Sequence, residues 1–166
     1  MLNFILQKGD IRGDMVPPSI DSGQSIGDGL LPSAILRVGC SLYSPGGGFR
    51  LMFQEDQNVV LQCLTNPPPR IWLEGVPFEP PAATAWTPLW ATGTNGQGTT
   101  QLCMQSDGNL VVYSGSSVLD GNGVLPSNTS GNQGAFLRMQ DDGNLVIYSS
   151  DGAALWSSNT NAQSQL

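Results

Sequence analysis

The chain has 166 residues, a length that fits one domain with a substantial core, and it carries a formal net charge of −7. Its 21 Gly, 12 Pro and low share of charged residues, 11%, favour strands and loops over helices. The absence of His removes the commonest general base and metal ligand, and an acidic chain with 6 Lys and Arg residues is unsuited to nucleic acid or an anionic membrane.

The beginning of the chain lies outside any regular pattern, and we expect residues 1–33 to form an N-terminal arm. Residues 1–6 are apolar apart from Asn3, but Gln7 and Lys8 end this run too early for a secretory signal peptide. The location of the protein stays unknown, with a released or extracellular protein as one reading. No apolar run reaches the ~20 residues of a membrane span, so we expect no membrane insertion.

A nine-residue pattern recurs along the rest of the chain. Gln-x-Asp-x-Asn-x-Val-x-Tyr occurs at residues 105–113 and 140–148, and residues 54–62 repeat it with Gln62 in place of the final Tyr. Self-similarity of this kind indicates a fold built from repeated units.

Each copy of the pattern predicts a β-hairpin. In the last copy, Asp-Gly between alternating apolar residues is a strong hairpin signal, because Gly accepts the positive φ of such turns. We expect strands at 137–140 and 144–148 joined by a turn at 141–143. The two-residue period of a strand directs Leu145 and Ile147 to the core and the polar residues of the pattern to the opposite face.

A Pro-rich segment separates the first copy from the second. The interval between these copies exceeds the interval between the second and third, which marks residues of about 65–88 as an insertion. Because Pro cannot donate to a sheet, we expect a surface loop. For its aromatic residues Trp72, Phe78 and Trp86 we favour anchoring of the loop to the body over contact with a ligand or partner.

The three copies, together with the Trp-containing segments 89–94 and 155–160, resemble the bulb-type (monocot) mannose-binding lectins. The likeness runs from about residue 34 to the C-terminus and is of the bacterial, single-domain kind. It implies an all-β fold of the β-prism II type, in which three four-stranded antiparallel sheets surround a pseudo-threefold axis. The implied division is an arm at 1–33 and a lectin domain at 34–166, with the insertion inside it.

The resemblance implies a multivalent lectin that binds terminal D-mannose, without catalysis and without a cofactor or metal. Its mannose-binding residues are Gln105, Asp107, Asn109, Val111, Tyr113, Gln140, Asp142, Asn144, Val146 and Tyr148. The first copy keeps Gln54, Asp56, Asn58 and Val60 but lacks the Tyr, which predicts a degenerate site. In this scheme Asp and Asn bind the axial 2-hydroxyl, Gln the 3-hydroxyl and Tyr the 4-hydroxyl, while Val packs against the ring. Turn formation alone explains the Asp and Asn, but it does not explain the Gln and Tyr.

Two further expectations come from the resemblance. A C-terminal strand completes the first sheet in this family, in its own chain or in a partner, so we expect residues 155–161 to favour a homodimer. Residues 124–129 align with the Trp segments but have Pro126 where Trp would sit. We therefore expect the core near the axis to be filled by Trp72 or Trp86.

The three Cys residues leave two readings open. Cys63 follows the first copy and Cys103 precedes the second, so a possible disulfide between them would close the insertion at its base. Free thiols in a reducing compartment are the alternative. No Cys pair has the spacing of a zinc site.

A second class of function remains beside the lectin. The same fold could serve as a protein-interaction or bacteriocin-like module, with partly decayed sugar sites and with contacts through the insertion or the arm. Lectin-like bacteriocins usually carry two tandem prisms, whereas this chain has the repeats for one.

Overall fold

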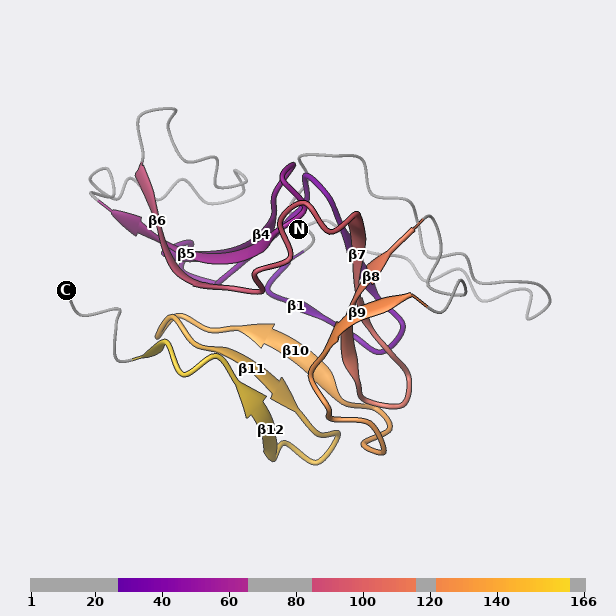
Figure 1. Ribbon diagram of the computed structural model, residues 1–166. Helices are drawn as coiled ribbons and strands as arrows, with labels where there is room; N and C mark the ends of the chain where they lie inside the picture. Colours follow the sequence, from indigo (N-terminus) through magenta and orange to yellow (C-terminus); the bar gives the residue numbers. More distant parts are fainter. Residues whose placement is uncertain (1–26, 66–84, 116–121, 162–166) are drawn as a thin grey trace, which may run out of the picture.

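The computed structural model describes residues 27–65, 85–115 and 122–161, and these residues form an all-β domain (Figure 1). They contain three four-stranded antiparallel sheets, as the sequence predicts, and no α-helix is assigned within them. No helix in these ranges is long and apolar enough to cross a membrane. The predicted residues 1–26 of the arm and 66–84 of the insertion lie outside the described residues.

The strands of the described residues are β1 (Gly29–Leu30), β2 (Ile35–Arg37), β3 (Ser41–Tyr43), β4 (Phe49–Phe53), β5 (Val59–Thr65), β6 (Ala85–Ala91), β7 (Thr99–Met104), β8 (Leu110–Ser114), β9 (Gly123–Pro126), β10 (Phe136–Met139), β11 (Leu145–Tyr148) and β12 (Ala154–Ser157). Their order in the sheets is β3-β4-β5-β6, β2-β7-β8-β9 and β1-β10-β11-β12. Each sheet thus takes three strands from one repeat and one short strand from the segment that precedes the repeats.

The three predicted hairpins are β4–β5, β7–β8 and β10–β11, each with one copy of the pattern at its turn. In the last copy the backbone N–H of Gln140 donates to the carbonyl of Asn144 at 3.0 Å, and the N–H of Gly143 donates to the carbonyl of Gln140 at 3.1 Å. Gly143 has φ +85°, which the tight turn requires and which Gly adopts without a steric penalty. The first copy makes the same turn with Gln57 at φ +74°.

The chain reaches all three sheets before the first hairpin. β1 pairs with β10, β2 pairs with β7 and β3 pairs with β4, all within residues 29–43. Because β1 is a sheet strand and Leu30 is 1% exposed, the folded body begins before residue 34, where the sequence suggested the end of the arm.

The last strand closes its own repeat. β12 pairs with β11 in the same chain, with Val146 opposite Ser157. The expectation that the C-terminal strand completes the first sheet was wrong, because β6 already occupies that edge, beside β5. The third strand of every repeat, β6, β9 or β12, therefore pairs with the return strand that precedes it.

The core lies between the inner faces of the three sheets. Because side chains alternate along a strand, every second residue of a strand points into it. Leu110 and Val112 of β8 belong to it, whereas Val111 and Tyr113 belong to a separate apolar group on the outer face. The core residues that are less than 2% exposed include Leu36, Leu42, Leu51, Phe53, Leu61, Met104, Leu137, Met139, Leu145 and Ile147. The predicted inward direction of Leu145 and Ile147 is confirmed.

The Trp position of the second repeat holds Leu125, not Pro126 as we expected from the alignment. Trp90, Trp156 and Leu125 each lie opposite the eighth residue of their own copy of the pattern, which is Leu61, Ile147 or Val112. Pro126 lies one place further along, opposite Val111. The expected alignment of residues 124–129 with the Trp segments was therefore shifted by one residue.

Candidate functional site

Three polar groups lie on the outer faces of the hairpins, one on each sheet. Each uses the turn residues of one copy of the pattern together with the seventh and ninth residues on the return strand. The outer faces point away from the common core, so the copies form separate sites. A shared catalytic centre is not built from them.

In the second copy the outer residues of the pattern bond to one another. The Nε2 of Gln105 donates to the hydroxyl of Tyr113 at 2.6 Å. The backbone N–H of Asn109 donates to Oδ1 of Asp107 at 3.0 Å, which fixes the carboxylate against the turn. Val111 is 4% exposed and lies between these groups along β8. The structure thus brings together all five residues that the sequence selected.

The side chain of Asn109 also connects the hairpin to the next strand. Its Oδ1 accepts hydrogen bonds from Oγ of Ser127 at 3.0 Å and from the backbone N–H of Thr129 at 3.2 Å. Thr129 in turn donates from Oγ1 to the carbonyl of Gly108 at 2.6 Å. The carbonyl side of Asn109 is therefore occupied, and among the described residues its Nδ2 remains available as a donor.

The third copy has the same arrangement. The Nε2 of Gln140 donates to the hydroxyl of Tyr148 at 2.6 Å, and the N–H of Asn144 donates to Oδ1 of Asp142 at 2.9 Å. Oδ1 of Asn144 accepts from Ser158 Oγ at 3.1 Å. Two sites more than thirty residues apart along the chain therefore repeat the same atoms and bonds.

The first copy keeps the turn and loses the phenol. Oδ1 of Asn58 accepts from Thr92 Oγ1 at 3.0 Å, and the N–H of Asn58 donates to Asp56 at 3.0 Å. Gln62, however, accepts a hydrogen bond from Nε of Arg50 at 2.7 Å, so a cation borders this site. Gln54 therefore lacks the Tyr partner that Gln105 and Gln140 have.

Arg50 belongs to an aromatic group that the sequence did not reveal. Its guanidinium carbon lies 4.2 Å from the ring centroid of Trp86, and the ring of Trp86 meets Tyr43 edge-on at 6.0 Å. We expected Trp86 either to anchor the insertion or to fill the core. It lies in β6 beside Arg50 of β4 and does not fill the core, and Trp72 lies outside the described residues.

The residue opposite the ninth position of the pattern differs among the sheets. Arg50 stands there in the first sheet, Gln101 in the second and Phe136 in the third. Phe136 stacks on Tyr148 with ring centroids 5.8 Å apart. Gln101 is 2% exposed, and its Nε2 has no hydrogen-bond partner among the described residues. The three sites therefore share the same turn but differ in the residue that pairs with the ninth position of the pattern.

The serine and threonine residues that hold the Asn side chains were missed, although the sequence carries a signal for them. They occur as a repeated Ser/Thr-x-Thr after each third strand, at 92–94, 127–129 and 158–160. The central residues of these triplets, when not Gly, adopt positive φ, with 62° at Asn128 and 56° at Asn159. Asn tolerates this conformation better than most residues, which suits it to this position.

Cys103 lies on the outer face under the second site, in contact with the group formed by Val111, Tyr113 and Ile35. Burial, reinforced by the nearby Asp107 carboxylate, raises the pKa of its thiol to about 11. The same two causes, with Cys103 as a further one, raise the pKa of Tyr113 above its ordinary value. Near neutral pH the phenol therefore keeps its proton and can both accept from Gln105 and donate outward.

The possible disulfide between Cys63 and Cys103 is not formed, and both are free cysteines. Cys63 lies in β5 opposite Phe49, whereas Cys103 lies in β7 opposite Ile35. The two residues belong to different sheets, so the base of the insertion is not closed by this bridge.

No family model matches the sequence. A curated relative, the B-type lectin plumieribetin from Scorpaena plumieri, is 38% identical over 81 residues, which are 49% of this chain and 52% of that protein. The chain thus spans about half the length of this relative.

Solved structures match most of the chain. A Marasmius oreades lectin covers 84% of this chain, which covers 98% of it in return, with 25% identity and a TM-score of 0.62. A monomeric monocot mannose-binding lectin from Gastrodia elata is 35% identical, with a TM-score of 0.59 and coverage of 81% of this chain and 96% of that one.

Proposed function

Because the chain belongs to the bulb-type (monocot) mannose-binding lectin family, we propose that it binds terminal D-mannose at the second and third copies of its nine-residue pattern. As a member of this family it is a carbohydrate-binding lectin and not an enzyme. The observation that carries the proposal is the identical bonding in the two copies, with a 2.6 Å hydrogen bond from Gln to Tyr in each.

In the proposed complex the turn reads the 2-hydroxyl that distinguishes mannose from glucose. Oδ2 of Asp107 accepts from this axial hydroxyl, and Nδ2 of Asn109 donates to it. Oδ1 of each side chain already has protein partners, which fixes the two groups in place before the sugar arrives. Equatorial glucose presents its 2-hydroxyl in another direction and leaves the carboxylate without its partner, so it binds more weakly.

The remaining groups of the site contact the rest of the ring. Gln105 binds the 3-hydroxyl, Tyr113 binds the 4-hydroxyl, and Val111 packs against the ring carbons. The third copy assigns the same roles to its own five residues. The first copy contributes weak binding or none, because Gln62 and Arg50 replace the phenol.

The placement of the two proposed sites supports multivalent binding. The second site lies on β7–β8 and the third on β10–β11, in different sheets with outward faces. A glycan with several mannose ends can therefore engage both sites, and weak single-site affinities are then raised by avidity. For one methyl α-mannoside we expect a Kd on the order of millimolar, since a shallow face offers few contacts.

A conservative substitution tests the assignment. Asp107→Asn with Asp142→Asn keeps an Oδ1 that can accept from the turn N–H but replaces the second acceptor with an NH₂ group. Titration calorimetry or NMR with methyl α-mannoside should show binding lost in the double variant and reduced to one site in each single variant. Asp56→Asn, the matched change in the first copy, should leave binding unchanged. Normal mannose binding by the double variant would show that the assignment is wrong.

An interaction module is the second candidate, and the group of Tyr43, Arg50 and Trp86 on the first sheet favours it. These three residue types are enriched in protein interfaces. If the wild type binds no sugar on a glycan array, this reading replaces the lectin reading, and Trp86→Ala should then weaken partner binding.

A homodimer also remains a proposal. β12 is paired within its own chain, so a partner is not needed to complete that sheet. Sedimentation at high concentration distinguishes a dimer from a monomer, and a monomer there would end the proposal.

A further inference from the structure

The side chains at the equivalent position of β6, β9 and β12 differ in size, which breaks the threefold symmetry of the core. Trp90 and Trp156 meet edge-on with ring centroids 5.7 Å apart and an interplanar angle of 69°. Leu125, which occupies the equivalent position in β9, is 40% exposed. A branched aliphatic side chain thus stands where the pattern of the other two repeats has an indole.

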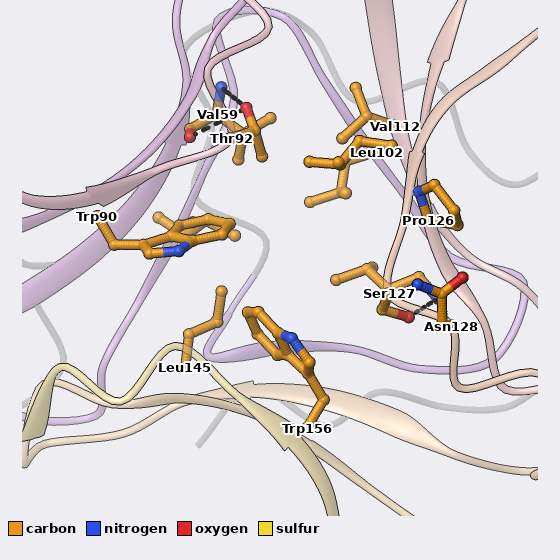
Figure 2. Close-up of a pocket in the computed structure, with 13 residues that line it drawn as sticks. Val59, Trp90, Thr92, Leu102, Val112, Pro126, Ser127, Asn128, Leu145 and Trp156 are labelled. Carbon is orange, nitrogen blue, oxygen red and sulfur yellow. Dashed lines mark hydrogen bonds between the residues drawn. The ribbon is translucent and has the colours of Figure 1, made fainter.

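A cavity of about 260 Å³ lies beside Leu125 (Figure 2). Its walls come from the inner faces of all three sheets, and Figure 2 shows Trp90 and Trp156 on one side of the space, with Val112 and Leu102 across from them. Pro126 and Ser127 of the β9 segment border the remaining side. The space therefore lies where the missing third indole would be expected to pack.

The chemistry of the walls favours an apolar occupant. Most lining residues are aliphatic or aromatic. The hydroxyls of Thr92 and Ser127 at the rim are already bonded to Asn58 and Asn109, at 3.0 Å each. The space opens to the surface beside the exposed Leu125 and Asn128, and its apolar walls offer water few polar partners. For comparison, an enclosed apolar cavity of ~150 Å³ binds benzene. A space larger than that accommodates a second fused ring.

We propose that this cavity binds a planar, uncharged bicyclic aromatic molecule of the size of indole. The ligand takes the third place beside Trp90 and Trp156, where edge-to-face contacts between rings are favourable. Asn128, an exposed residue at the rim, is placed to bond a polar group on the ligand's outer edge. This site is separate from the outer-face sugar sites, and the inference does not depend on mannose binding.

Indole itself is the probe, and the full chain is the sample. Titration calorimetry should give a Kd on the order of 0.1–1 mM, as expected for a small apolar ligand. In the wild type, ring-current shifts should appear at the methyl signals of Val112 and Leu145, which line the cavity. Methyl groups of the outer face, such as those of Val146, should not shift. Absence of binding, or shifts confined to the outer face, would overturn the proposal.

A second experiment fills the cavity with a larger side chain of the protein itself. Leu125→Trp should abolish indole binding and raise the midpoint of thermal unfolding by roughly a few degrees, because it replaces a void with packed side chain. Leu31→Trp is the matched control, since Leu31 is 70% exposed and does not line the cavity; it should bind indole as the wild type does. Unchanged indole binding by a folded Leu125→Trp variant would refute the proposal. Indole binding that appears only in Trp72→Ala would likewise refute it, in favour of a side chain of the same protein.

Discussion

The Oδ1 of Asn144 accepts a hydrogen bond from Oγ of Ser158 at 3.1 Å, which ties the third candidate site to the strand that follows it. The backbone N–H of Thr160 donates to the same oxygen at 3.3 Å. Strand alternation alone predicts an outward side chain that can be removed without loss of stability. The structure adds a stabilising role for this side chain, because its bonds to Ser158 and Thr160 tie the hairpin to the segment after β12.

Asn109→Ala combined with Asn144→Ala should therefore have two effects. Mannose binding should be abolished, and the free energy of unfolding should fall by about 1–3 kcal/mol per site, because Ser and Thr donors lose their acceptor. Urea unfolding and titration with methyl α-mannoside measure the two effects. Asn95→Ala, at an exposed turn residue, is the control and should change neither. Full stability in the double variant would contradict the structural role of the Asn side chains.

Restoring the first site should require two substitutions rather than one. Gln62→Tyr alone leaves Arg50 beside the new phenol, with its guanidinium held over Trp86. Arg50→Phe together with Gln62→Tyr reproduces the pair of Phe136 and Tyr148 in the third site. We expect NMR titration to detect a third mannose site in the double variant and none in Gln62→Tyr.

The matched control for this conversion is Arg50→Phe alone. It removes the cation but restores no hydroxyl for Gln54, so it should add no site. A third site in either single variant would show that Arg50 does not control the first copy in the way argued above.

The hairpins were predictable because their determinants are local. Asp-Gly at the turn and alternating apolar residues after it fix both the reversal of the chain and the face that is buried, as Leu145 and Ile147 illustrate. The five residues of each intact site follow from the same pattern, since the turn and one face of a strand bring them together.

What the sequence did not reveal depends on pairing between distant segments. The strands β1, β2 and β3 are only two or three residues long, and no local pattern indicates that each joins a different sheet. The group of Arg50 and Trp86 spans the insertion and has no repeat to mark it. The error at Pro126 has a different cause, since the second repeat has no Trp to mark the position. The Ser/Thr-x-Thr triplet follows Leu125 at the same spacing as it follows Trp90 and Trp156, so it identifies Leu125 as the equivalent residue, in agreement with the strand register.

The raised pKa of Cys103 predicts how stability varies in alkali. Burial raises this pKa from its ordinary value of 9.0 to about 11, so the unfolded chain loses the proton more readily than the folded one. The stabilisation is fully present below about pH 9 and is lost as the pH rises toward 11, by up to about 1.4 kcal/mol per pH unit. Tyr113, whose pKa is also raised, adds a loss of the same sign.

Cys103→Ala removes the thiol contribution together with the part of the Tyr113 shift that Cys103 causes, and it leaves the Tyr113 side chain in place. Urea unfolding between about pH 8 and 11 should show a shallower decline in this variant than in the wild type. A thiol reagent at about pH 8 should react with partly exposed Cys63 while Cys103 stays unmodified in the folded protein. Equal declines in both proteins would contradict the assignment to Cys103.

Two glycines with positive φ allow the effect of backbone strain on stability to be distinguished from that of steric overlap. Gly108 lies in the turn of the second site, and Gly96 lies outside that site. Gly96 has φ +71° and open space where a Cβ would stand, whereas Gly108 has φ +91° and faces the backbone oxygen of Asn132. Gly96→Ala should cost about 1–2 kcal/mol of unfolding free energy, from the left-handed backbone alone. Gly108→Ala carries the same strain and also forces the turn away from Asn132, so we expect it to cost more.

The displacement at Gly108 should also be visible in binding. Its N–H donates to the carbonyl of Gln105 at 3.1 Å and its own carbonyl accepts from Thr129, so a shift of this residue moves the second site. Titration of Gly108→Ala with methyl α-mannoside should show the second site weakened and the third, on another sheet, unchanged. Gly96→Ala should keep both. A Gly108→Ala variant as stable as Gly96→Ala, with both sites intact, would show that the turn yields without moving the site residues.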